Sequence, residues 1–236
     1  MKAYSLANRF LTILPWPAAP DEYGPREAHS ALVRFPLVGL ALGLILVAGD
    51  TVLGVVFPSP VRDGFIVIAL IVLSGGKPLG AVSAWADVLW GKGGRFPSLP
   101  AAAALAGILL FKFAALLALP DRGRWSALIL APVLGRAAMA YLIVQIPGAG
   151  RREGAVLDVD PSPDDGYATI GWTLAVSLVF GFIGGIFIAL LAGAGTMALK
   201  RFIDLREGED DADVHSAAGE VIETAAFLLC SAWWGG

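Results

Sequence analysis

Long apolar stretches separated by short charged loops occupy the chain from about residue 35 to its end. Six of them approach or exceed the roughly 20 residues that a helix needs to cross the ~30 Å hydrocarbon layer of a membrane. They are Ser30–Phe57, Gly64–Ala86, Pro100–Leu119, Trp125–Ile146, Ala168–Leu199 and Ser216–Trp234. Because a bilayer offers no water to exposed backbone groups, runs of this length must be helical. The pattern predicts an all-α, polytopic membrane helical bundle that forms one transmembrane domain, residues 1–236.

Two of these stretches contain a break. The sequence Ser74–Pro78 interrupts the second one, and irregular backbone at membrane depth survives only where protein or water covers it. The break therefore favours a cavity, with a plain loop between two short helices as the alternative. Ala168–Leu199 is too long for one helix of ordinary tilt, and the glycines in Gly181–Gly185 supply the backbone freedom for a kink or a reversal. We expect six to seven spans, near 33–57, 64–86, 100–119, 125–146, 168–182, 183–202 and 215–234.

The distribution of basic residues over the loops favours a reversal in the fifth stretch. If Ala168–Leu199 is one helix, eight lysines and arginines lie on one side of the membrane and six on the other. A hairpin moves Lys200, Arg201 and Arg206 across, which gives eleven against three. Membrane proteins show such a bias in their short loops, so we prefer the hairpin.

Smaller features shape the first part of the chain. Residues 4–14 predict a short N-terminal interfacial helix with Asn8 and Arg9 on its polar side, and a disordered lead-in is the alternative. In the first span, Gly39 and Gly43 form a pair of small residues four apart, which suits close contact with another helix.

Composition agrees with a membrane protein and narrows its function. The chain is 57% hydrophobic and 16% charged, its mean hydropathy is +0.73, and a soluble domain would carry about a quarter charged residues. A net charge of -3 argues against nucleic acid as a partner, since that would need a basic face. One cysteine, Cys230, excludes a disulfide framework and a thiolate metal site, and two histidines are too few for a His-rich site.

Charged residues within apolar stretches are costly and are more often functional than charged residues on a surface. Lys77, Asp87, Lys112 and Arg136 fit this description, and Asp50 lies near the end of the first span. Arg136 needs a carboxylate, a phosphate or carbonyl dipoles as a partner. For Lys112, a structural ion pair or a side chain that reaches the membrane surface is an alternative to function.

Three polar segments could bind ions. Arg151 and Arg152 offer paired donors that suit a phosphate, although basic loops are also common on the inner side of a membrane. The aspartates of Asp158–Asp165 could hold a divalent cation or belong to a solvated turn. In the last span, helical spacing places Asp213, Glu220 and Glu223 on one face. Such a cluster suits Mg²⁺ together with substrate phosphates, or simply complements the helix dipole.

The chain resembles the cobalamin synthase family, the integral-membrane adenosylcobinamide-GDP ribazoletransferases, over nearly its whole length. No single piece is specific, but several occur in the family's order and at matching spacing. They are FLTILPWP (Phe10–Pro17), FPLVGLALGLIL (Phe35–Leu46), SGG (Ser74–Gly76), FKFAALLAL around Lys112, GRAAM around Arg136, RREG (Arg151–Gly154), LKR (Leu199–Arg201) and the acidic Asp213–Glu223 segment.

This resemblance implies a Mg²⁺-dependent phosphotransferase-type enzyme. It would join α-ribazole or its 5′-phosphate to GDP-activated cobinamide and release GMP, late in cobalamin synthesis. The implied residues are Asp87 and Arg136 for catalysis, Arg151, Arg152 and Lys112 for substrate phosphate, and Asp213, Glu220 and Glu223 for the metal. The resemblance also implies a bacterial inner (cytoplasmic) membrane protein whose polar site faces the cytoplasm.

The chain departs from the family in its aspartate-rich motif. The family's H-L-D-G-L-A-D-T-x-D-G aligns with KPLGAVSAWADV, in which Pro78, Gly80 and Ala84 replace the histidine and two aspartates, and Asp87 keeps the third. The family's D-S-R-x-G segment has no counterpart. Two readings follow: a divergent synthase that builds its cation site from other acids, or a degenerate member that binds a ligand or forms a homo- or hetero-oligomer with an active synthase. A small membrane transporter is a weaker alternative.

Overall fold

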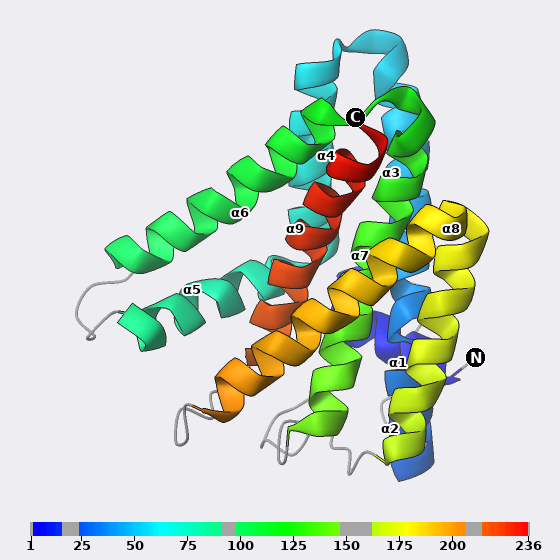
Figure 1. Cartoon of the computed structure of the whole chain (residues 1–236), viewed down its shortest axis with the longest axis vertical. Helices are drawn as coiled ribbons and strands as arrows, with labels where there is room; N and C mark the ends of the chain where they lie inside the picture. The colour runs from blue at the N-terminus through cyan, green and yellow to red at the C-terminus, as the bar shows by residue number, and fades with distance from the viewer. Residues whose placement is uncertain (1, 16–23, 91–97, 147–161, 206–213, 236) are drawn as a thin grey trace.

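The computed structural model describes residues 2–15, 24–90, 98–146, 162–205 and 214–235. These residues form helices and no strand, so the predicted all-α fold is confirmed. The helices are α1 (Lys2–Leu11), α2 (Pro25–Val33), α3 (Phe35–Val56), α4 (Ser59–Leu73), α5 (Lys77–Trp90), α6 (Leu99–Ala118), α7 (Asp121–Gln145), α8 (Pro163–Asp204) and α9 (Val214–Trp234) (Figure 1).

Several of these helices are long and apolar enough to cross a membrane. Four of them pass by length and composition, namely α3, α6, α7 and α8, and the bent pair of α4 and α5 makes up to five. The chain is therefore a polytopic membrane protein, and the number of spans stays a prediction.

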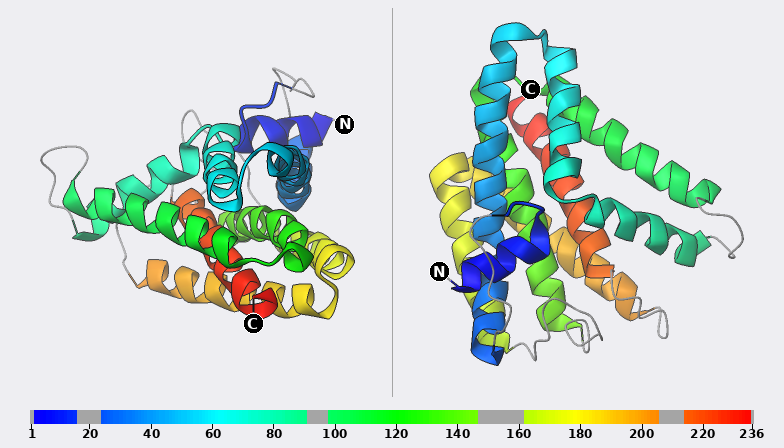
Figure 2. Two further views of the ribbon diagram at one scale, coloured as in Figure 1. Left: turned by 90° about the horizontal axis from the view of Figure 1, so that it is seen from above. Right: turned by 180° about the vertical axis from the view of Figure 1, so that it is seen from behind.

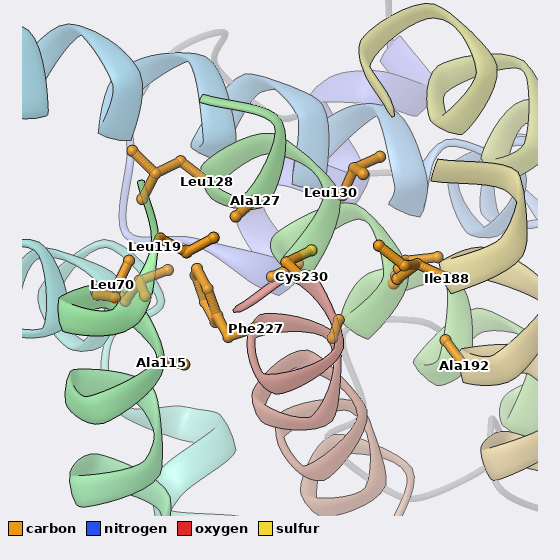
Figure 3. Packing of buried hydrophobic residues seen from close by; sticks show 14 of the residues in the cluster. Leu70, Ala115, Leu119, Ala127, Leu128, Leu130, Ile188, Ala192, Phe227 and Cys230 are labelled. Atoms are coloured by element: carbon orange, nitrogen blue, oxygen red, sulfur yellow. The ribbon is translucent and has the colours of Figure 1, made fainter. Parts of the chain in front are cut away.

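Helix α7 is the centre of the bundle. Most of its length is buried, and it packs against α3, α8 and α9. Figure 3 shows Phe227 and Cys230 of α9 among the side chains of Leu119, Ala127 and Leu128. These residues belong to one buried apolar cluster that unites the middle of the molecule.

The predicted small-residue pair of α3 makes a close contact with α7. A Cβ atom added to Gly39 would lie 2.6 Å from the carbonyl oxygen of Pro132, and one added to Gly43 would lie 2.6 Å from the Cα atom of Ile129. Both positions therefore leave room only for hydrogen, and they allow the backbones of α3 and α7 to touch.

The chain turns sharply between α4 and α5, as the break at Ser74–Pro78 suggested. The two helices are bent by 84°, and both Gly75 and Gly76 have φ of 68°, a conformation that favours glycine. The N-terminal segment covers this turn, because the amide of Ile13 donates to the carbonyl of Leu73 (3.0 Å). The carbonyl of Leu73, at the end of α4, is thus hydrogen-bonded within the protein, as irregular backbone at membrane depth requires.

Helix α8 folds back on itself at Phe182. This residue has φ of 51° and ψ of -141°, which interrupts the helix, and Figure 1 shows the chain reversing there. Residues eight apart in a straight helix lie about 12 Å apart along its axis. A Cβ atom on Gly185 would instead overlap the carbonyl oxygen of Ser177. Both ends of α8 therefore lie at the same end of the bundle (Figure 1).

The N-terminal helix differs from the expectation in one respect. Asn8 was expected on the polar side and is instead buried, whereas Arg9 is exposed. The Asn8 side chain donates to the carbonyl of Leu14 (3.0 Å) and accepts from the hydroxyl of Thr12 (2.9 Å). The amide is therefore used to shape the turn after α1, and the position of this helix at a membrane surface stays a prediction.

A buried charge network, here called the upper clamp, joins α3, α4 and α7. It consists of Asp50, Asp63 and Arg124, which are each at most 2% exposed. Arg124 Nε and Nη2 donate to Asp50 Oδ1 at 2.9 and 2.7 Å, and Nη2 also pairs with Asp63. Arg62 approaches Asp50 Oδ1 at 3.4 Å. Because one guanidinium serves two carboxylates, the clamp fixes these helices where α3 ends and α4 begins (Figure 1).

The close α3–α7 contact yields the first prediction. Gly39→Ala should lower the free energy of unfolding by about 1–3 kcal/mol, because the added methyl overlaps the α7 backbone. Gly49→Ala is the matched control on the same helix, where an added Cβ atom meets nothing within 4 Å. It should leave stability unchanged or raise it by up to about 1 kcal/mol through helix propensity. Thermal unfolding in detergent measures both, and equal stabilities would contradict the packing.

The upper clamp yields a second prediction. Arg124→Met should destabilise the chain by about 3–5 kcal/mol, because it leaves buried Asp63 without its cation and Asp50 with Arg62 alone. The triple variant Arg124→Met, Asp50→Asn, Asp63→Asn removes the unpaired charges and should recover most of that loss. Chemical unfolding in micelles compares the two, and an Arg124→Met protein as stable as the wild type would show that the clamp is unimportant.

Candidate functional site

Four charged side chains from three helices meet inside the bundle, in what we call the charge cluster. Lys112 of α6 donates to Glu220 Oε1 at 2.5 Å and to Glu223 Oε1 at 2.6 Å, both on α9. Arg136 of α7 forms an ion pair with the other carboxylate oxygen of Glu223. Two positive and two negative charges make the cluster electrically neutral.

The charge cluster is almost completely shielded from solvent. Its four residues are between 1% and 6% exposed. Taking such charges out of water costs several kcal/mol for each ion, and only close pairing of opposite charges offsets that cost. The short distances are what a neutral group in a low-dielectric interior requires, since no water replaces a missing partner.

Small residues on α7 and α9 bring the arginine to the glutamate. A Cβ atom on Gly135 would lie 2.8 Å from the carbonyl oxygen of Gly219 and 2.8 Å from the Cβ atom of Glu223, and one on Gly219 would overlap the Met139 side chain. The two backbones can approach this closely only because both positions are glycine. Arg136, which follows Gly135 directly, is thereby held beside Glu223.

The charge cluster lies beside a small cavity under the turn between α4 and α5. Ser74 and Leu79 from the two sides of this turn line it together with Lys112, Arg136 and both glutamates. Its volume of about 10 Å³ is near the minimum for one water molecule. Arg136 also contributes a buried Nε that has no hydrogen-bond partner among the described residues. The break favours a cavity at this place over a plain loop, and two of the charged residues of the apolar stretches, Lys112 and Arg136, line it.

The structure separates the predicted site residues into three groups. Lys112, Arg136, Glu220 and Glu223 come together in the charge cluster. Asp87 of α5 is not among the residues that line the cavity. It accepts a hydrogen bond from the hydroxyl of Ser98, which also caps the start of α6. The predicted phosphate and metal residues Arg151, Arg152 and Asp213 lie outside the described residues.

The described residues do not fit a magnesium ion in this arrangement. Glu220 and Glu223 already pair with Lys112 and Arg136, and their neutralised oxygens do not offer the free negative charge that a hard cation needs. Within the part of the chain that the structure describes, no three His, Cys, Asp or Glu side chains gather in a way that could hold a metal. Mg²⁺ stays a prediction from the family resemblance.

Sequence reasoning did not single out other polar residues that the structure pairs. Asp63 and Arg124 form the upper clamp, although the sequence treated Arg124 as a loop residue. Each lies one residue before a predicted apolar stretch, and the structure extends the helices α4 and α7 far enough to include both. His29 of α2 pairs with Asp165 of α8 through Nδ1 at 2.7 Å. This contact ties α2 to α8. Asp165 ends the acidic segment Asp158–Asp165, of which residues 158–161 lie outside the described residues, and no pattern in the sequence indicates His29 as its partner.

The comparisons with known proteins agree in one family. Residues 3–98 and 99–231 match the cobalamin-5-phosphate synthase family. A protein named adenosylcobinamide-GDP ribazoletransferase from Pseudomonas fluorescens (strain Pf-5) is 32% identical over 97% of this chain and 98% of its own length. A protein of the same name from Roseiflexus sp. (strain RS-1) is 35% identical over 93% of this chain and 85% of its own length. No solved structure matches the chain. The chain belongs to the cobalamin-5-phosphate synthase family.

Proposed function

We propose that this chain is an adenosylcobinamide-GDP ribazoletransferase. Relatives of that name match this chain over nearly their whole length. The observation that carries the proposal is the buried pair of cations, Lys112 and Arg136, beside a cavity between α4, α5, α6, α7 and α9. A pyrophosphate is the part of a GDP-activated substrate that such a pair recognises best, because both cations are shielded from competing water.

The proposed reaction needs charge stabilisation more than covalent help. A hydroxyl oxygen of α-ribazole forms a bond to the cobinamide-side phosphorus, the bridging P–O bond breaks, GMP leaves with the bridging oxygen, and one proton is released. Positioning and electrostatic stabilisation supply most of the catalysis in displacements of this kind. Arg136 offers a planar fork of donors to phosphate oxygens, and Lys112 adds a compact positive charge.

The rigid parts of the fold support this role. Arg136 lies about 18 Å along α7 from Arg124 of the upper clamp, since twelve residues separate them and each adds about 1.5 Å. Gly135 and Gly219 fix its backbone against α9. Catalytic groups need this precision, because a small displacement costs a large factor in rate.

The orientation of the site is also part of the proposal. The substrates are made in the cytoplasm, so the chain would lie in the bacterial inner membrane with the cavity open to the cytoplasmic side. The reversal of α8 supports this placement, because it gives the loop division with the stronger bias in basic residues.

A transferase assay tests the proposal. Membranes that contain this chain, GDP-cobinamide, α-ribazole and Mg²⁺ should yield cobalamin and GMP. Arg136→Lys keeps the positive charge beside Glu223 but loses the fork of donors, so kcat/KM should fall about 100-fold, or about 2.7 kcal/mol. Arg122→Lys makes the same change at the exposed far end of α7 and should leave kcat/KM unchanged.

Two results would decide against this function. A folded wild-type protein that gives no product, and that purifies together with a second synthase, would support the degenerate member of an oligomer. Equal activities of Arg136→Lys and Arg122→Lys would show that the charge cluster takes no part in the reaction, even if the chain is active.

A further inference from the structure

We propose that Glu220 and Glu223 are internal counter-ions that the substrate pyrophosphate displaces from Lys112 and Arg136, after α5 swings aside at Gly75 and Gly76. This inference rests on the proposed function and deepens it, because it says how the same site admits its ligand. It assigns the two glutamates a positioning role: they pair with the two cations in the absence of ligand, and they separate from them when the pyrophosphate binds.

The charges require an exchange of this kind. The charge cluster is neutral without a ligand, and a pyrophosphate that links two groups adds two negative charges. Lys112 and Arg136 can neutralise either the two carboxylates or the two ligand charges. If carboxylates and ligand were present together, two negative charges would stay unpaired, which a low-dielectric site does not tolerate. Glu223 touches both cations, so it is the carboxylate whose departure frees the most positive charge.

Arg136 supplies an anchor for the incoming anion. Its Nε is buried and lacks a hydrogen-bond partner among the described residues, while its side chain lines the cavity. A phosphate oxygen beside this Nε accepts the hydrogen bond that no described group accepts now. This donor is an observation independent of the ion pairs, and it indicates an anion rather than a second cation.

The cavity must widen before any phosphate enters. At about 10 Å³ it offers room for one water molecule at most. Of the helices that line it, α6, α7 and α9 contribute the charged side chains, whereas α5 contributes Leu79 alone. Helix α5 packs on α6 and α9 and joins α4 through two glycines with φ of 68°.

The start of α5 has open space on one side. Cβ atoms built on Gly76 and Gly80 meet nothing within 4 Å, in contrast to the tight glycines of α3 and α7. Rotation about the Gly75–Gly76 turn moves Leu79 away from the charge cluster without disturbing the α7 contacts. Helix α5 buries Ala81 and Val82 against Ala217 of α9, so these contacts must open when Leu79 moves away.

Pyrophosphate binding to the full-length chain in detergent tests the exchange. The probe is inorganic pyrophosphate, and calorimetry measures its Kd. Glu223→Gln removes the competing charge and should lower Kd by about tenfold or more. Asp121→Asn removes the same charge from an exposed position on α7 and should leave Kd unchanged. Equal Kd values for Glu223→Gln and the wild type, or no pyrophosphate binding by any of these proteins, would overturn the inference.

Two further variants keep the test decisive if Glu223→Gln fails to fold. Glu220→Gln, whose partner is Lys112, should also lower Kd, and an unchanged Kd would count against the exchange. The second variant carries a disulfide between α5 and α9, made by Ala217→Cys with either Ala81→Cys or Val82→Cys. These positions share one buried cluster. The disulfide should weaken pyrophosphate binding about tenfold, and its reduction should restore the binding. Binding that ignores this disulfide would overturn the movement of α5.

These measurements are separable from the proposed function, because none of them uses turnover. Tighter pyrophosphate binding by Glu223→Gln together with an inactive wild type would retain the exchange and reject the transferase. Turnover by the wild type with no change of Kd in either glutamate variant would retain the transferase and reject the exchange.

Discussion

A charge inside a membrane protein must find its partner within the protein, and this constraint shapes the structure around Lys112 and Arg136. Neither cation can reach water, since both are at most 3% exposed. Each is held instead by a glutamate of α9, and this requires α6, α7 and α9 to meet at one level. The glycines at 135 and 219 satisfy that requirement, because they let α7 and α9 approach until Arg136 and Glu223 touch.

The two charge networks of the bundle have different mechanical properties. In the upper clamp, Arg124 binds Asp50 and Asp63 through several hydrogen bonds, and the surrounding helices are tightly joined. The charge cluster lies instead under a glycine turn, beside a cavity that α5 lines with one side chain, Leu79. Binding needs a rigid frame with a movable part. Figure 2 shows α5 and α6 diverging from the other helices of the bundle.

Sequence reasoning predicted the features that depend on hydrophobicity and backbone freedom. The apolar stretches became helices, Gly39 and Gly43 became the α3–α7 contact, and the glycine-rich middle of Ala168–Leu199 contains the interruption at Phe182. These features are local, because a stretch of 20 apolar residues or a pair of glycines can be recognised within a few turns of helix.

The partners of the buried charges were harder to predict, because they are far apart in the sequence. Lys112 and Glu220 are separated by 108 residues, and no periodicity connects them. The sequence identified Lys112, Arg136, Glu220 and Glu223 as separate candidates for phosphate, catalysis and metal, whereas the structure pairs them with one another. Arg124 was read as a loop charge for the same reason. Asn8 was mispredicted for a different reason, because its amide bonds to Leu14 and Thr12 in the turn that follows its own helix and not to water.

The most direct measurement is an experimental structure of the full chain bound to a non-reactive analogue of GDP-activated cobinamide. The account predicts phosphate oxygens within hydrogen-bond distance of Lys112 Nζ and Arg136 Nε, with the Glu223 carboxylate turned away from both cations. A pyrophosphate bound elsewhere, with Lys112, Arg136, Glu220 and Glu223 paired as they are without ligand, would contradict it.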